Sequence, residues 1–296
     1  MELRQLAYFV KAAETSHFTE AAAAMYITQS TLSQQIKALE TELGMPLFDR
    51  VGKHVQLTEA GSVFLLHARQ ILLDVEKGKQ AIEDLQNLLT GDLRIGATYA
   101  FTSLLLPALN AFPGKYPGLR IFVDYGNTEE LERKLRSSQL DFILAFHQLT
   151  PGKEFESQEL FTSKIVMAVS KKHPMAQLKE INLKNLDGME LILASKGFSS
   201  RDFLSEVLER HKVYPAVKIE LNDVHALLSM LEGGHWVTLL NERALNGWKN
   251  LVAVPIAGKA LLRKAYILWQ KGTYRKKAAD LFVKELMKGI EKQKQP

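Results

Sequence analysis

Residues 28–37 carry a row of short polar side chains that could read DNA. Leu32, Ile36, Leu39 and Leu43 recur at steps of four, three and four, and this spacing predicts a helix with one buried stripe. The opposite face would present uncharged hydrogen-bonding groups and one lysine, which suit base edges and phosphates in the major groove. A threonine ahead of the helix could cap it and aim its N-terminus at a phosphate. The candidate DNA contacts on this helix are Thr28, Gln29, Ser30, Thr31, Ser33, Gln34 and Lys37.

The segments before this helix predict the elements that would position it. A pair of amphipathic helices is by itself more often an ordinary structural element, so its surroundings matter. A short alanine-rich helix, residues 19–25, comes first and is joined to the polar helix by a turn at 26–28. An earlier helix is predicted from its regularly spaced apolar residues, Leu3, Leu6, Ala7, Val10 and Ala13. Three helices in this order predict a helix-turn-helix core.

The segment after the polar helix predicts a wing. Gly44 can end the helix as a C′ glycine, and Pro46 prevents the helix from resuming. Residues 51–57 are expected to form two short strands, after which a threonine at position 58 caps a new helix. Arg50, Lys53 and His54 lie in or beside these strands and complete the candidate DNA contacts. Residues 1–58 are therefore predicted to form a winged helix-turn-helix domain.

Four linked segments of this region resemble one protein family. F-T-E-A-A-A-A-M, T-Q-S-T-L-S-Q-Q-I, L-E-T-E-L-G-M-P-L-F-D-R and L-T-E-A-G match the pattern of the LysR-type transcriptional regulators in order and spacing. Two positions depart from that pattern: Ser30 stands where the family usually has proline, and Gln34 where arginine is common. The resemblance implies a DNA-binding domain of that family, with base contacts that differ in detail.

Composition limits the class of protein. A chain of 296 residues suggests about two domains. It has no cysteine, which fits the reducing cytoplasm, and no apolar run long enough for a membrane span. Its N-terminus does not have the pattern of a signal peptide, so we expect a cytoplasmic protein without membrane contact. The eight histidines lack metal-ligand spacing, and we expect neither a metal nor a cofactor.

Charge does not explain the predicted DNA binding. Residues 1–65 hold five basic and seven acidic side chains, a formal charge of −2, although the whole chain is +5. Much of the basic excess lies near the C-terminus, where a run of charged residues usually forms the solvent-exposed face of a helix. Affinity for DNA would then depend on hydrogen bonds and on dimerisation more than on ionic phosphate contacts.

A long helix, residues 59–90, is expected to link two domains. Its apolar positions alternate at steps of four and three, which is the spacing of a coiled-coil seam. The alternative is a long helix that lies on its own domain. The candidate dimerisation residues are Phe64, Ile71, Val75, Ile82, Leu85 and Leu89.

The remainder of the chain, residues 91–296, alternates predicted strands with helices, which favours a parallel α/β sheet. The expected strands are 93–97, 120–125, 141–146, 165–170, 191–194, 217–221, 236–240 and 262–269, and the expected helices are 103–112, 128–138, 201–212, 223–232 and 274–291. L-R-I-G-A, G-N-T-E-E-L, L-D-F-I-L-A-F and W-V-T-L-L-N resemble the regulatory domain of the same family. That resemblance implies a fold like a periplasmic binding protein, with lobe I at about 91–163 and 267–296 and lobe II at about 164–266.

An effector site is expected where strands end and helices begin, since ligands of open α/β sheets bind there. Hydroxyl groups beside helix N-termini favour a small anionic or polar ligand, and aromatic residues would supply apolar walls. Each residue also has an ordinary reading: the polar ones as helix caps, and His147 as a surface histidine. The candidate ligand contacts are Thr98, Tyr99, Ala100, Phe101, Thr102, Asn127, Thr128, Phe146, His147, Phe198 and Ser199.

These features together favour a ligand-responsive transcriptional regulator that is not an enzyme. It would bind a pseudo-palindromic operator as a dimer or a dimer of dimers, respond to a small effector and contact RNA polymerase. One alternative is a cytoplasmic α/β enzyme, but G-x-S-x-G, P-loop and G-x-G-x-x-G motifs are missing from the sequence. Another is a solute-binding protein, which would need an export signal and has no use for a helix-turn-helix.

Overall fold

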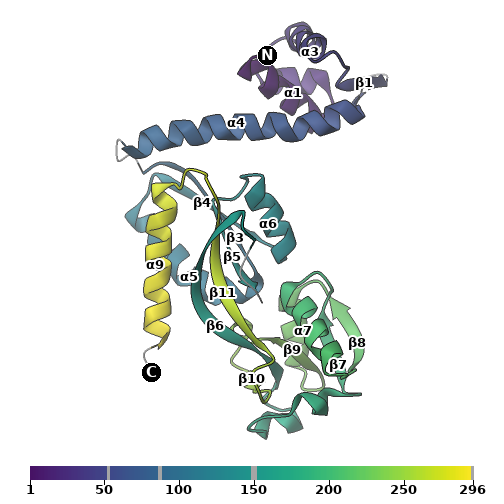
Figure 1. Ribbon diagram of the computed structural model, residues 1–296, viewed down its shortest axis with the longest axis vertical. Helices are drawn as coiled ribbons and strands as arrows, with labels where there is room; N and C mark the ends of the chain where they lie inside the picture. The colour runs from purple at the N-terminus through teal and green to yellow at the C-terminus, as the bar shows by residue number, and fades with distance from the viewer. Residues whose placement is uncertain (52–53, 86–88, 148–151, 295–296) are drawn as a thin grey trace. The chain divides into compact units, whose positions relative to one another are not determined.

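The computed structural model describes residues 1–51, 54–85, 89–147 and 152–294, and the chain forms two compact units, Met1–Gln86 and Asn87–Pro296 (Figure 1). Each unit has a hydrophobic core of its own. None of the helices in the described ranges is long and apolar enough to cross a membrane.

The first unit is the predicted winged helix-turn-helix. It contains α1 (Leu3–Thr15), α2 (Phe18–Ala24), α3 (Gln29–Leu43), and the antiparallel wing strands β1 (Phe48–Val51) and β2 (His54–Leu57). Leu32, Ile36 and Leu39 are buried in its core, as their spacing predicts, whereas Leu43 is exposed. Thr28 caps α3, since its hydroxyl oxygen accepts the Thr31 N–H at 3.2 Å. The local sequence thus determines where the recognition helix begins.

The long helix α4 (Glu59–Leu85) packs onto this unit over its first half. Phe64 and Ile71 pack against the core of the unit. At these two positions α4 therefore lies on its own domain, which was the alternative to a dimer seam. Val75 is half-buried, Ile82 is 59% exposed, and the side chain of Leu85 is outside the described residues. Leu89, expected on the same seam, instead packs against the core of the second unit.

The second unit has the predicted α/β class, but its sheet is mixed, so the expectation of a parallel sheet is wrong. Strands β3 (Gly91–Ala97), β4 (Leu119–Tyr125) and β5 (Phe142–His147) are parallel, but β11 (Leu262–Gln270) runs antiparallel to β5 and to β6 (Phe155–Ser170). The expectation assumed that each strand is joined to the next by a crossover helix, as in a βαβ unit. Antiparallel neighbours need no such helix, so the alternation of strands and helices does not fix the direction of β6 and β11.

Helices cover both faces of the lobe I sheet. Helices α5 (Thr102–Lys115) and α9 (Lys277–Lys294) pack on the face that carries Phe142, Leu144 and Phe146, together with the short 3₁₀ helix η1 (Tyr99–Phe101). Helix α6 (Thr128–Arg136) packs on the opposite face, against Ile143 and Ala145. The continuous apolar run of β5 is explained by this burial on both sides.

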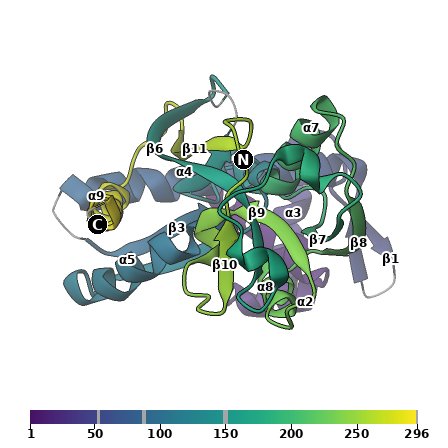
Figure 2. The same ribbon diagram turned by 90° about the horizontal axis from the view of Figure 1, so that it is seen from below.

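Lobe II is built on the second half of β6. Between Lys164 and Ile165 this strand exchanges its partner β11 for β9 (Val237–Asn241), and β10 (Leu251–Val254) pairs on its other side. The parallel pair β7 (Glu190–Ala194) and β8 (Ala216–Leu221) belongs to the same lobe, with α7 (Ser199–Arg210), α8 (Val224–Leu231) and the 3₁₀ helices η2 (Pro174–Gln177), η3 (Leu183–Leu186) and η4 (Glu242–Leu245). Strands β6 and β11 run side by side through the unit in Figure 1 and also lie next to each other in the turned view of Figure 2.

Candidate functional site

The polar face of α3 is open to solvent. Thr28, Gln29, Ser30, Thr31, Gln34 and Lys37 are exposed, and Ser33 is half-buried. At the start of the helix three hydroxyls gather, with Thr28 Oγ1 lying 2.9 Å from Ser30 Oγ and 2.8 Å from Thr31 Oγ1. Lys53 lies outside the described residues, as do the side chains of Arg50 and His54. Most of the predicted DNA contacts thus share one accessible helix face.

Glu40 holds the wing to the recognition helix. One carboxylate oxygen accepts the backbone N–H of Leu47 at 2.8 Å and that of Phe48 at 3.2 Å. Both bonds join α3 to the segment that leads into β1, and charge-assisted bonds of this kind are stronger than neutral ones. Position 40 is therefore a structural residue, although it is an acidic side chain in a DNA-binding unit.

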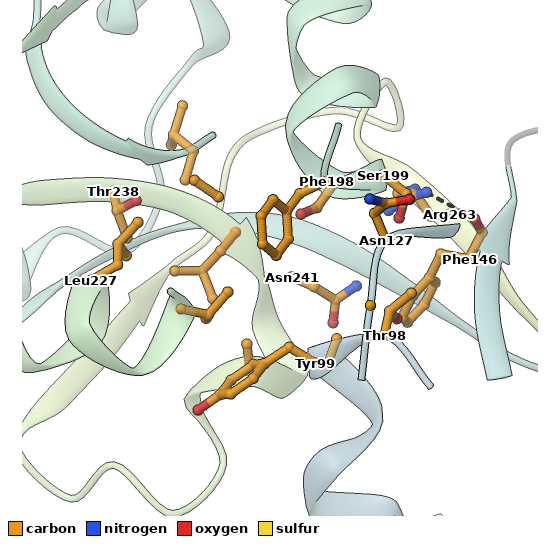
Figure 3. A pocket seen from close by; sticks show the side chains of 18 residues that line it. Thr98, Tyr99, Asn127, Phe146, Phe198, Ser199, Leu227, Thr238, Asn241 and Arg263 are labelled. Atoms are coloured by element: carbon orange, nitrogen blue, oxygen red, sulfur yellow. Dashed lines mark hydrogen bonds between the residues drawn. The ribbon is translucent and has the colours of Figure 1, made fainter. Parts of the chain in front are cut away.

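A cavity lies between the two lobes of the second unit (Figure 3). It contains about 570 Å³ of space not filled by protein atoms, part of it open to solvent. Lobe I contributes the loop after β3, the start of α6 and the end of β5. Lobe II contributes the starts of α7 and α8, strand β9 and η4. The lining residues are Thr98, Tyr99, Ala100, Gly126, Asn127, Phe146, Ala194, Phe198, Ser199, Ser200, Val224, Leu227, Thr238, Leu239, Leu240, Asn241, Ala244 and Arg263.

The structure brings seven of the predicted ligand contacts to this cavity, namely Thr98, Tyr99, Ala100, Asn127, Phe146, Phe198 and Ser199. Asn127 also caps α6, because its side-chain oxygen accepts the Glu130 N–H at 2.8 Å. The two readings of Asn127 are therefore compatible: its side chain caps a helix that begins at the cavity wall.

Four predicted contacts lie beside the cavity and do not line it. Phe101 is fully buried in the lobe I core, with its ring centroid 4.9 Å from that of Phe146. Thr102 donates its hydroxyl to the Tyr99 carbonyl at 2.7 Å, and Thr128 has a buried hydroxyl without a described partner. His147 is turned toward α6, where its Nε2 lies 3.1 Å from a carboxylate oxygen of Glu132.

Three buried polar residues of the cavity were missed by the sequence reasoning: Thr238 and Asn241 on β9, and Arg263 on β11. Thr238 lies between the core residues Val237 and Leu239, whereas Asn241 ends β9 and Arg263 lies near the start of β11. The available signal was the alternation along β11, which puts Arg263 on the same face as Ala265, Ile267 and Trp269.

Arg263 carries the cavity's positive charge. It is 4% exposed, and its Nη2 donates to the Phe146 carbonyl at 3.0 Å. Burial lowers the pKa of Arg263 to about 10, an effect that the charge of Asp202 opposes. The group remains a cation at neutral pH, because its pKa stays well above 7.

Tyr99 joins the two lobes at the cavity wall. Its hydroxyl is hydrogen-bonded to Trp248 of lobe II, and burial raises the pKa of Tyr99 above its ordinary value of 10.0. Nearby, Asn246 of lobe II donates to the Ser103 hydroxyl of lobe I at 3.1 Å. Contacts between lobes therefore adjoin the cavity, so a change in the cavity could alter how the lobes meet.

Two family models match the chain. The bacterial regulatory helix-turn-helix protein model of the lysR family matches residues 3–62, and the LysR substrate binding domain model matches residues 86–290. Among curated proteins, the uncharacterized HTH-type transcriptional regulator YwqM of Bacillus subtilis is 35% identical over 246 residues, which cover 82% of this chain and 83% of YwqM.

Solved structures share the fold. Full-length CbnR complexed with its target DNA has a TM-score of 0.71 at 21% identity. The match covers 98% of this chain and 100% of CbnR. The regulatory domain of CcmR from Synechocystis PCC6803, in complex with 2-PG, has a TM-score of 0.61 at 21% identity and covers 68% of this chain and 98% of that domain. At these identities the likeness concerns the fold.

Proposed function

This chain belongs to the LysR family of bacterial transcriptional regulators, and from that premise we propose that it binds a two-fold related operator as a dimer or a dimer of dimers and responds to a small effector. The observation that carries the proposal is the pairing of an accessible polar recognition helix in one unit with a donor-lined cavity in the other. We expect it to act on DNA in the cytoplasm and to contact RNA polymerase.

Base reading is assigned to the exposed face of α3. Gln34 suits an adenine, which offers a donor and an acceptor to an amide group in the major groove. Gln29 and Ser30 are exposed on the same face near the helix N-terminus. This face carries one lysine, so specificity would depend on hydrogen bonds. Because few phosphates would be neutralised, the affinity for DNA should fall less with added salt than that of most DNA-binding proteins.

Dimerisation is assigned to α4, but on a stripe shifted from the one that the sequence suggested. Phe64 and Ile71 are engaged in the core of their own unit. Val63 and Leu66 remain 59% and 69% exposed, and Leu73 follows them on the same stripe, half-buried. Positions 63, 66, 70 and 73 keep the alternating three and four spacing of a coiled-coil seam. The exposed Val63 and Leu66, with the half-buried Leu73 on the same stripe and Gln70 as its polar member, support a second copy of the chain as partner.

Effector binding is assigned to the cavity between the lobes. A ligand held by both lobes shifts the equilibrium toward the arrangement that it binds better, which is the physical requirement for coupling to operator binding. The described lining residues include no histidine, lysine or carboxylate that could serve as a general base. This composition supports binding, rather than catalysis, as the role of the cavity.

The test is a mobility-shift titration with the DNA upstream of the chain's own gene. We expect specific retardation by the wild-type protein, competed by the same DNA but not by an unrelated fragment of equal length. The matched variant Gln34→Ala should lose most of this specificity. Retardation by both fragments alike would refute sequence-specific binding, and no retardation at low salt would refute DNA binding itself.

A further inference from the structure

Arg263 is a buried cation that forms no ion pair with a carboxylate in the described part of the chain. Its one hydrogen bond to protein there runs to the Phe146 carbonyl, although a guanidinium offers five N–H donors. The rings of Phe146 and Phe203 lie 5.3 and 5.1 Å from Cζ and offset part of the charge. Asp202 acts on Arg263 only as a more distant charge. A buried cation in this state favours an anionic partner.

Other polar groups of the same cavity also lack partners. Thr98 Oγ1, Thr238 Oγ1, Asn241 Nδ2 and Arg263 Nε are buried without a hydrogen-bond partner among the described residues. The residues that carry them come from both lobes and all line the cavity. Two of the atoms can only donate, and the hydroxyls can donate as well. An arginine that merely joined Phe146 to Phe203 would not require this set of donors around it.

Three helix N-termini meet the cavity but add little net charge: that of α8 is capped by the carboxylate of Asp223, and those of α6 and α7 carry acidic residues in their first turns. Helix α6 begins at Thr128 and α7 at Ser199, and a helix N-terminus carries about half a positive charge. Each helix places acidic residues in its own first turn, Glu129 and Glu130 in α6 and Asp202 in α7. These carboxylates offset the dipoles, so Arg263 remains the one formal charge among the described lining residues.

The cavity has a polar end and an apolar end. In Figure 3 Asn127, Ser199 and Arg263 are drawn together at one end, whereas Leu227 lies at the other with Thr238. Further aliphatic residues of the wall are Val224, Leu239 and Leu240. The cavity has only about 570 Å³ of space not filled by protein atoms, part of it open to solvent, so a ligand of this site is small.

We infer that the effector is a small monoanion: a single carboxylate-type group held by Arg263, with a short apolar body directed toward Leu227. The inference rests on the proposed function, because it names the chemical class of ligand for the effector cavity. One positive charge balances one negative charge. A second anionic group would lie beside Leu227 and the other aliphatic residues, where Thr238 offers one neutral hydroxyl and no positive charge, which is unfavourable.

The test compares three four-carbon probes that differ in charge. Butyrate is a monoanion, butyramide is its neutral analogue, and succinate carries a second carboxylate. Thermal unfolding of the full-length protein is followed against probe concentration at constant ionic strength, since a ligand of the native state raises the midpoint by mass action. We expect butyrate to bind at least tenfold more tightly than butyramide or succinate.

Variants separate a ligand contact from a structural arginine. Arg263→Met should abolish the response to butyrate, whereas Arg120→Met, which removes an exposed arginine of lobe I, should keep it. If Arg263→Met fails to fold, Thr98→Val is the second variant, because Thr98 lines the cavity away from the Leu227 end (Figure 3). Its hydroxyl has no hydrogen-bond partner within the described part of the chain, so the apo protein should be as stable as wild type while butyrate binds several-fold more weakly.

Each other outcome overturns the inference. Equal binding of butyramide would remove the charge requirement, and equal or tighter binding of succinate would remove the single-charge limit while leaving the effector cavity intact. A butyrate response that survives Arg263→Met would make Arg263 a structural residue. No response to any of the three probes would refute the monoanion class, but operator retardation, measured without effector, would still support the proposed function.

Discussion

Leu66→Ala should weaken self-association of the full-length protein. A fully buried leucine side chain contributes about 1.5–3 kcal/mol. Leu66 is 69% exposed on α4, so covering the rest of it in a dimer contributes up to about 1–2 kcal/mol per copy. Two-fold symmetry doubles this to about 2–4 kcal/mol. Because about 1.4 kcal/mol corresponds to tenfold in Kd, the dimer Kd should rise about 30- to 700-fold.

The assay is sedimentation equilibrium over a concentration series, with Leu178→Ala as the matched control. Leu178 is also an exposed leucine, at 42%, but it lies in lobe II far along the chain from α4. Far-UV circular dichroism of both variants should match wild type, since neither side chain belongs to a core cluster of the described residues. An unchanged Kd for Leu66→Ala, with the fold intact, would refute the assignment of the dimer seam to this stripe.

Four further predictions address the recognition helix, the cavity wall and the long helix. Gln34→Ala should cost about 1–3 kcal/mol of specific operator binding and leave non-specific binding unchanged, measured by competition; an equal loss of both would make Gln34 a phosphate contact. Thr102→Val should leave butyrate binding as in wild type, because the Thr102 hydroxyl is already bonded to the Tyr99 carbonyl; a tenfold loss would place Thr102 at the ligand. Gly61→Ala should destabilise the first unit by about 1–3 kcal/mol in urea, because an added Cβ would clash with the Leu47 carbonyl oxygen, and an unchanged midpoint would contradict that close approach. Since burial raises the pKa of Tyr99, its native state holds the proton more tightly than the unfolded chain, so stability should fall as pH rises above about 10, and Tyr99→Phe should reduce that loss.

Local patterns predicted the elements that depend on neighbouring residues. Helix α3 begins after the Thr28 cap and is followed by Gly44 with a φ of 72°, both as expected. The first half of β6, residues 155–164, was not predicted, because four of its first five residues are exposed and polar. Strand β10 was missed as well, since four residues give too short a pattern to distinguish a strand. These two strands are defined by distant partners, not by their own sequence.

The cavity shows the same division. Seven of the eleven predicted ligand contacts line it, because they lie in loops that follow strands, where sequence position predicts location. Thr238, Asn241 and Arg263 could not be found in this way. They are polar residues inside strands, and only the packing of the two lobes places them at one cavity.

By itself, the sequence determined the winged helix-turn-helix, the long helix after it and the α/β class of the second unit, since periodicity, caps and turn residues act over a few positions. The tertiary structure decided the direction of the central strands, the side of α4 that stays exposed and the burial of Arg263. Strand pairing and lobe packing join residues as far apart as Thr98 and Arg263, and contacts over such separations leave no local pattern. The chemistry of the cavity that we propose for the effector therefore depends on the fold that brings these residues together.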